Sequence, residues 1–202
     1  MRSAANPITS ETDHDAAAIA VLADLCRPLK DGAALRPRCV VVQPNEIPHP
    51  TDALLVHHEH MTEVLQRRYG GLVDVHVHDE HLEGDVYTRK VSLTPVNSAQ
   101  VVEWGIVRID FRFMSRDVRE EILSRQTPLG AILVKHNVHR RVKPRWFMRF
   151  PAHGPMLSFF GDTSDEPLYG RIGTIYCNEE PAIDLLEIVT RRNNEVSVEE
   201  LS

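Results

Sequence analysis

The chain has 202 residues, of which 42% are hydrophobic and 26% are charged, a composition typical of a soluble protein with one globular domain. Its net charge of −6 gives no overall attraction to nucleic acids or anionic membranes, and no apolar run approaches the ~20 residues that span a bilayer. The charge is nevertheless uneven, because residues 89–153 carry 13 basic and 5 acidic side chains between two acidic segments. This cationic middle segment raises the question of which anion it serves.

The cysteines are odd in number and form no CxxC pair, which argues against a disulfide framework and against a zinc knuckle: Cys26, Cys39 and Cys177. The apolar stretch 16–25 is short and follows Asp13 and Asp15 rather than a basic segment, so it does not resemble a signal peptide. We therefore expect a cytoplasmic protein with reduced thiols.

Residues 1–50 predict an N-terminal extension with one helix and a Pro-rich loop. Apolar residues recur at helical spacing between Ile19 and Leu29, so the helix is expected to end near Pro28. A short strand is predicted over residues 38–43, and the prolines at 44, 48 and 50 indicate a loop after it.

From Thr51 the apolar positions predict a helix that stops at Gly70 and Gly71. The period then changes to two, which is typical of a half-buried strand beginning near Val73. A turn at 83–85 leads into a second strand over 86–94, and a third is expected over 101–111.

Ser115 is predicted to cap a helix that runs through Arg125, and Thr127 to cap a shorter helix with Pro128 at its first position. Further strands are expected over residues 138–150, 169–176 and 183–190. Strands joined by short turns, with helices before and between them, favour an α+β fold on a single antiparallel sheet.

Two charged residues occupy positions where the strand pattern requires apolar side chains. Arg89 shares a face with Tyr87 and Val91, and Glu187 shares a face with Leu185. An unpaired buried charge costs several kcal/mol, so each must find a partner. Either the two pair with each other inside the sheet or they face a ligand in a pocket, where a carboxylate in apolar surroundings suits proton transfer.

Six histidines lie between residues 57 and 81: His57, His58, His60, His76, His78 and His81. Two of them, His76 and His78, share a strand face and could bind zinc together with one of the helical histidines. The alternation with valines equally predicts a solvated polar face, and no HExxH spacing or accompanying carboxylate supports a metal. No metal is assigned.

Residues 139–149 combine cations with aromatic side chains, as single-stranded nucleic-acid binders do. The alternative, which we favour, is an edge strand with one buried and one basic, solvated face; the buried positions would be Val142, Trp146, Met148 and Phe150. A nucleic-acid partner is therefore not expected, and neither is a membrane.

Four segments, in this order, resemble the chorismate pyruvate-lyase family. They are residues 54–63 with Met61 and Thr62, residues 87–93 with Arg89, the TPLG turn at 127–130, and the hairpin from Tyr169-Gly170-Arg171 to Leu185-Leu186-Glu187. The resemblance covers residues 51–190 as one lyase-like domain, between the N-terminal extension 1–50 and a polar C-terminal tail, 191–202.

The resemblance implies a single antiparallel sheet with helices packed on one side and helical flaps over a buried ligand, a fold shared with UTRA-type effector domains of bacterial regulators. It implies that Arg89 binds a substrate carboxylate and that Glu187 contacts the hydroxyl or ether region and assists proton movement. Met61 and Leu129 would line the pocket, and Arg171 would help to bind a second carboxylate.

The activity so implied is a lyase reaction that eliminates pyruvate from chorismate and leaves 4-hydroxybenzoate, without cofactor. The alternative is a non-catalytic binding protein for a small aromatic acid, like the UTRA-type effector domains. Such domains accompany a DNA-binding domain, for which the single helix expected in residues 1–50 is too little.

Overall fold

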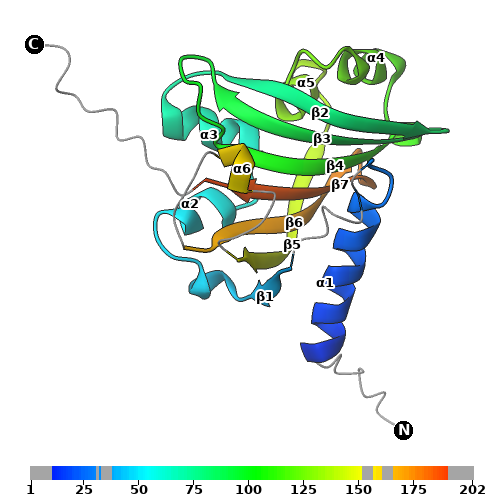
Figure 1. The fold of residues 1–202 in the computed structure, drawn as a ribbon. Coiled ribbons are helices and arrows are strands. Elements are labelled where there is room, and N and C mark those ends of the chain that lie inside the picture. The colour runs from blue at the N-terminus through cyan, green and yellow to red at the C-terminus, as the bar shows by residue number, and fades with distance from the viewer. Residues whose placement is uncertain (1–10, 31, 33–37, 152–156, 161–165, 191–202) are drawn as a thin grey trace, which may run out of the picture.

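A seven-stranded antiparallel sheet forms the centre of the molecule (Figure 1). The computed structural model describes residues 11–30, 32, 38–151, 157–160 and 166–190. The strands are β1 (Val40–Val42), β2 (Val73–Glu83), β3 (Val86–Pro95), β4 (Glu103–Asp110), β5 (Arg140–Phe150), β6 (Leu168–Cys177) and β7 (Glu180–Val189), in the spatial order β1-β5-β6-β7-β4-β3-β2. The predicted α+β fold with a single antiparallel sheet is confirmed.

The pairing of β4 with β7 joins two hairpin units that lie far apart in the sequence. β2, β3 and β4 follow one another along the chain, as do β5, β6 and β7, and the β4–β7 contact unites them in the middle of the sheet. In this register Gly105 lies opposite Glu187, and Glu187 lies opposite Arg171 on β6. Side chains from β3, β4, β6 and β7 therefore meet on one face.

Helices cover this face of the sheet, as expected. The helices are α2 (Thr51–Leu55), α3 (Met61–Tyr69), α4 (Arg116–Ser124) and α5 (Leu129–Lys135). Leu55 and Leu65 of α2 and α3 pack against Val189 of β7, and Ile122 and Ile132 of α4 and α5 belong to the cluster around β3 and β4. Each helix thus buries its apolar stripe on the sheet.

The opposite face is also covered, which differs from the expectation of helices on one side. Helix α1 (Glu11–Cys26) packs Leu22 and Leu25 against a cluster that includes Trp104 and Leu186, and the short helix α6 (Leu157–Phe160) adds Phe160. The central strands are apolar on both faces, so burial of both requires helices on both sides. None of the described helices is long and apolar enough to cross a membrane.

Two predicted boundaries are wrong. The helix expected from Thr51 to Gly70 is interrupted at residues 56–60 and forms α2 and α3, although its end at Gly70, in the left-handed conformation with φ 68°, is confirmed. Ser115 caps α4 as predicted, whereas α5 has Pro128 rather than Thr127 at its N-cap. Residues 1–10 and the tail 191–202 lie outside the described residues.

The basic-aromatic segment forms β5, whose buried positions are those predicted: Val142, Trp146, Met148 and Phe150. The expectation of an edge strand is wrong for residues 147–149, with which β1 pairs and forms the edge of the sheet; the β1 pairing does not extend to the first half of β5. An irregularity between Pro144 and Trp146 changes which face the alternating side chains occupy, so Val142 and Trp146 belong to different clusters.

Gly105 is required where β4 and β7 approach. A Cβ at this position would lie 2.4 Å from the backbone oxygen of Leu186, whereas a Cβ at Gly71 would meet no atom within 4 Å. Because backbone atoms cannot move aside cheaply, we expect Gly105→Ala to lower the free energy of unfolding by at least about 2 kcal/mol. Gly71→Ala is the matched control, and equal effects of the two substitutions in urea denaturation would contradict this account.

Candidate functional site

A cavity of about 50 Å³ lies between the sheet and the first turns of α3 and α5, on the face of the sheet that α2 to α5 cover. Met61 and Leu129, the first residues of these helices, line it, as do apolar side chains of the sheet: Val75, Val91, Leu93, Val107, Ile175 and Leu185. Its charged lining residues are Arg89, Glu103 and Glu187. The structure therefore brings four of the five predicted site residues to one cavity: Met61, Arg89, Leu129 and Glu187. Arg171 does not line the cavity but contacts Glu187.

Arg89 is buried, and no described residue forms an ion pair with it. Its side chain is 1% exposed, and no described residue accepts a hydrogen bond from its Nε or Nη1. Burial lowers the pKa of the Arg89 guanidinium, although arginine stays charged at neutral pH. Leaving such a charge unmatched is costly, which makes Arg89 a ready partner for an anion in the cavity.

The nearest acidic neighbour of Arg89 along the sheet has other partners. Glu80 lies opposite Arg89 in the β2–β3 register, but it accepts a 2.6 Å hydrogen bond from the hydroxyl of Tyr87 and is ion-paired with Arg125. Burial and this hydrogen bond raise the pKa of Tyr87 to about 12. The carboxylate of Glu80, on the neighbouring edge strand β2, is therefore bonded to Tyr87 and Arg125.

Glu187 pairs with Arg171 rather than with Arg89. Nε of Arg171 donates to Oε2 of Glu187 over 2.6 Å, and both side chains are buried. The alternative in which Arg89 and Glu187 pair with each other inside the sheet is therefore wrong. The carboxylate of Glu187 reaches the cavity already matched by a cation.

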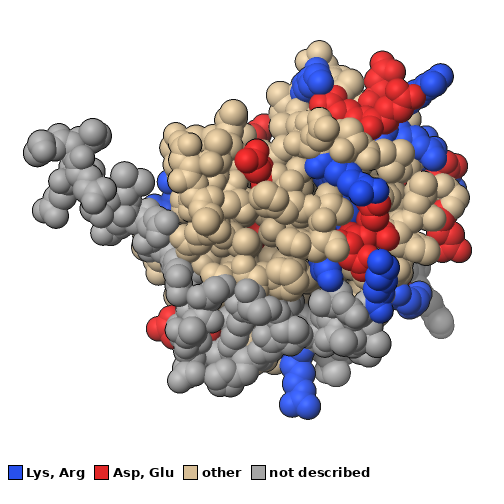
Figure 2. Space-filling model, turned by 45° about the horizontal axis from the view of Figure 1, so that its top comes forward, with Lys and Arg blue, Asp and Glu red and all other residues tan. Residues whose placement is uncertain are grey.

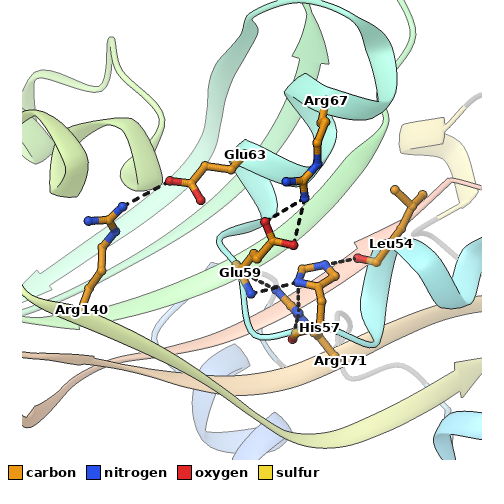
Figure 3. A network of polar contacts seen from close by, with 7 residues as sticks. All are labelled: Leu54, His57, Glu59, Glu63, Arg67, Arg140 and Arg171. Carbon is orange, nitrogen blue, oxygen red and sulfur yellow. Dashed lines mark hydrogen bonds and ion pairs between the residues drawn. The ribbon is translucent and has the colours of Figure 1, made fainter.

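The remaining donors of Arg171 hold the segment between α2 and α3 (Figure 3). Nη1 donates to the backbone oxygens of Leu55 and His57, and Nη2 donates to that of Glu59. These bonds satisfy carbonyl groups that a continuous helix would have bonded, which explains the interruption at residues 56–60. Because these donors are engaged within the chain, Arg171 serves in this structure as the counter-ion of Glu187, and its role at a second substrate carboxylate stays a prediction.

Glu103 is a third buried charged residue of the cavity, and it was not among the predicted site residues. It is 5% exposed and lies on β4, two residues before Gly105 and on the same face as Glu187. Burial, together with the neighbouring Glu187, raises the pKa of Glu103 well above its usual value. The sequence contained a sign of this residue, because Glu103 shares one face of the strand predicted over 101–111 with Gly105 and Val107, where an apolar side chain is expected.

The histidines near the cavity contribute no positive charge at neutral pH. His60 lines the cavity, and its Nε2 has no hydrogen-bond partner among the described residues. Burial lowers the pKa of both His60 and His57 below the usual 6.5 of histidine. In the part of the chain that the structure describes, no cluster of His, Cys, Asp and Glu could hold a metal ion.

The cations of residues 139–149 contact acidic and aromatic side chains of the same chain. Arg140 pairs with Glu63, and the Arg141 and Arg145 guanidinium groups lie 4.2 Å from the ring centroids of Tyr176 and Trp146. Figure 2 shows basic and acidic side chains interspersed on one face of the molecule. Much of the positive charge of the middle segment is thus matched at the surface.

In sequence, the chain matches no protein-family model and no curated protein. In structure it is distantly similar to PhnF from Mycobacterium smegmatis, with a TM-score of 0.49 and 12% identity over 64% of this chain and 63% of PhnF. The effector domain of PhnF gives 0.49 and 11% over 66% and 89%, and the C-terminal domain of YurK from Bacillus subtilis gives 0.36 and 11% over 57% and 84%. The chain thus spans less than two thirds of intact PhnF, and similarity at this level says nothing about the ligand.

We expect Arg171→Met to be strongly destabilising. The substitution leaves the buried Glu187 without its counter-ion and frees three backbone oxygens, so the free energy of unfolding should fall by about 3–5 kcal/mol. Adding Glu187→Leu removes the unmatched charge and should restore part of the loss. A double-mutant cycle in urea denaturation checks the coupling, and simple additivity of the two effects would argue against it.

We expect Glu103→Gln to stabilise the protein increasingly as the pH rises. The folded protein holds the Glu103 proton to a higher pH than the unfolded chain does, so wild-type stability falls as the pH rises above the unfolded pKa of about 4.3. The slope is at most about 1.4 kcal/mol per pH unit up to the folded pKa. Denaturation from pH 4.5 to 8 checks this against exposed Glu180→Gln; a pH-independent gain for Glu103→Gln would contradict it.

Proposed function

We propose that the chain binds a small aromatic carboxylic acid in the cavity, with the carboxylate on Arg89. The observation that carries this proposal is the buried guanidinium of Arg89, two of whose nitrogens have no partner among the described residues. An arginine in this state binds a carboxylate through charge-assisted hydrogen bonds and recovers the interaction that burial removed. The first-turn N–H groups of α3 at the same cavity also favour negative charge.

The remaining wall of the cavity fits an apolar ring. Between the charged side chains the surface consists of aliphatic groups from the sheet and from Met61 and Leu129. Arg89 on β3 and Glu187 on β7 are separated by β4 and are offset by two residues along the strands, that is by roughly 10 Å across the sheet and about 7 Å along it at the backbone. Both side chains line the cavity, so a ring bound there would lie between a cation and a carboxylate.

A cavity of about 50 Å³ accepts a few water-sized groups, so an aromatic acid requires α3 and α5 to move apart. The two helices meet closely above the cavity, because a Cβ at Gly130 would lie 2.9 Å from Oγ1 of Thr62. This contact is made by two short helices and contains no ion pair among the described residues. The proposed ligand would therefore be enclosed beneath the helices after it enters.

The carboxyl groups of Glu103 and Glu187 favour a second candidate function, the elimination of pyruvate from chorismate. A site that merely held an anion would lose affinity through nearby carboxylates, whereas acid and base groups are useful where a proton moves. In this reaction the ether bond between the ring and the enolpyruvyl group breaks and the ring loses a proton, which leaves aromatic 4-hydroxybenzoate; the enolpyruvyl group takes up a proton at its methylene carbon and leaves as pyruvate. The resemblance of the four sequence segments to chorismate pyruvate-lyases supports the same candidate.

In that reaction Arg89 would fix the ring carboxylate and Glu187 would contact the oxygen-bearing side of the ring and assist proton movement. Formation of the aromatic ring drives the reaction, so the chain need only hold the reactive conformer and match developing charge. Arg171 would keep Glu187 in place through its 2.6 Å hydrogen bond.

We expect saturable binding of 4-hydroxybenzoate by the wild type and at least tenfold weaker binding by Arg89→Met. Arg89→Met should also raise the free energy of unfolding by about 1–4 kcal/mol, because it replaces an unmatched buried charge with an apolar side chain. Calorimetric titration and urea denaturation measure the two effects, with exposed Arg149→Met as control. Unchanged binding by Arg89→Met would remove Arg89 from the site.

Incubation with chorismate separates the two candidates. Absorbance of 4-hydroxybenzoate should rise above the uncatalysed background with the wild type, and Glu187→Gln should slow turnover at least tenfold with little change in binding. Binding of 4-hydroxybenzoate without turnover of chorismate would leave the chain a binding protein. Neither binding nor turnover would contradict both candidates.

A further inference from the structure

The carboxyl group of Glu103 shares the cavity with Glu187, and the binding of a carboxylate to Arg89 gives it no role. The sheet places Glu103 and Gly105 successively on one face of β4, with Gly105 directly opposite Glu187. Oε1 of Glu103 lies 3.2 Å from the position that a Cβ of Gly105 would occupy. Because Gly105 has no side chain, the carboxyl group of Glu103 extends over it toward Glu187.

The groups around Glu103 favour its neutral form. Arg171 is the cation that acts on Glu103, but its Nε donates to Glu187, and Arg89 lies opposite Val107, four residues along β4 from Glu103. His60, from the segment before α3, is the other titratable group that lines the cavity, and burial keeps it uncharged. Glu187 is thus matched by a cation, whereas no described cation pairs with Glu103, and burial beside Glu187 favours its carboxylic acid form.

A neutral carboxyl group and a carboxylate side by side recognise a particular kind of ligand atom. The carboxylic acid donates one hydrogen bond, and the carboxylate only accepts. A hydroxyl group satisfies both, because it donates to one and accepts from the other, whereas a hydrogen atom at the same place on the ligand bonds to neither, so that Glu187 keeps only Arg171 and Glu103 has no ligand atom to donate to. Sites built to bind a hydroxyl group discriminate strongly against analogues that lack it.

On the basis of the proposed function, we propose that Glu103 donates a hydrogen bond to a hydroxyl group of the bound acid, and that Glu187 accepts the hydrogen of the same hydroxyl. Glu103 is then a specificity-determining residue, and the site selects a hydroxybenzoate over an unsubstituted benzoate. The carboxylate on Arg89 anchors both acids alike, so the preference arises at the opposite end of the cavity.

Calorimetric titration with 4-hydroxybenzoate and benzoate at pH 7 tests this role. The wild type should bind 4-hydroxybenzoate at least tenfold more tightly than benzoate. Glu103→Gln keeps a neutral donor of similar shape and should retain this preference within about threefold. Glu103→Leu removes the donor and should reduce the preference to less than about threefold while still binding benzoate. Glu180→Gln, an exposed change on β7, serves as the control.

Three results would overturn the assignment. Equal affinity of the wild type for the two acids would refute hydroxyl selection, and so would an undiminished preference in Glu103→Leu. Tightening of both acids by tenfold or more in Glu103→Gln would show that Glu103 is ionised, and this result decides the question even if Glu103→Leu does not fold. Wild-type protein that binds neither acid would instead contradict the proposed function itself.

Discussion

The buried ion pair between Arg171 and Glu187 connects the sheet to the helices that close the cavity. Its 2.6 Å hydrogen bond joins β6 to β7, and the other donors of Arg171 hold three backbone oxygens of the segment that enters α3. Removal of either partner would leave an unmatched charge buried between the sheet and the segment that leads into α3. The position of Met61 at the cavity thus depends on a guanidinium that does not itself line it.

The same pair explains why Arg89 is available. Had Glu187 been the partner of Arg89, the cavity would contain a neutral ion pair and no attraction for an acid. With Glu187 matched by Arg171 and Glu80 bonded to Tyr87 and Arg125, no described residue forms an ion pair with Arg89, although Glu80 still attracts its charge from the neighbouring strand. Of the basic side chains in residues 89–153, it is this one whose charge faces the cavity, while others form ion pairs at the surface.

Sequence patterns predicted the fold class and most strands because strand and helix periods are local properties. They also identified Arg89 and Glu187, since a charge on an apolar face stands out within one strand. They did not predict which charges pair, because pairing depends on the register between strands, and β4 and β7 are far apart in the sequence. Arg171 was assigned to a ligand for this reason, and the break at residues 56–60 was missed because it is stabilised by Arg171 on a distant strand.

Glu103 shows a different limit. Its position on an apolar face was visible in the sequence, but its pKa is raised by burial and by Glu187 on another strand, which is itself paired with Arg171. A buried carboxyl group alone would be expected to need a cation, whereas the proposed hydrogen-bond donor depends on a neighbouring carboxylate that already has one. Which carboxyl group pairs with Arg171 is determined by the register of the folded sheet, and a single strand sequence does not contain that register.

The contacts on the two sides of the cavity differ in kind. Moving the segment before α3 would break the hydrogen bonds of Arg171 to backbone oxygens and disturb the ion pair beneath them, and a buried charge that loses its partner costs several kcal/mol. Separating α5 from α3 breaks the packing of Gly130 against Thr62 and leaves that ion pair in place. It must nevertheless displace Ile132 and Leu133, which are fully buried in the core, so entry from the α5 side costs apolar burial rather than a buried charge.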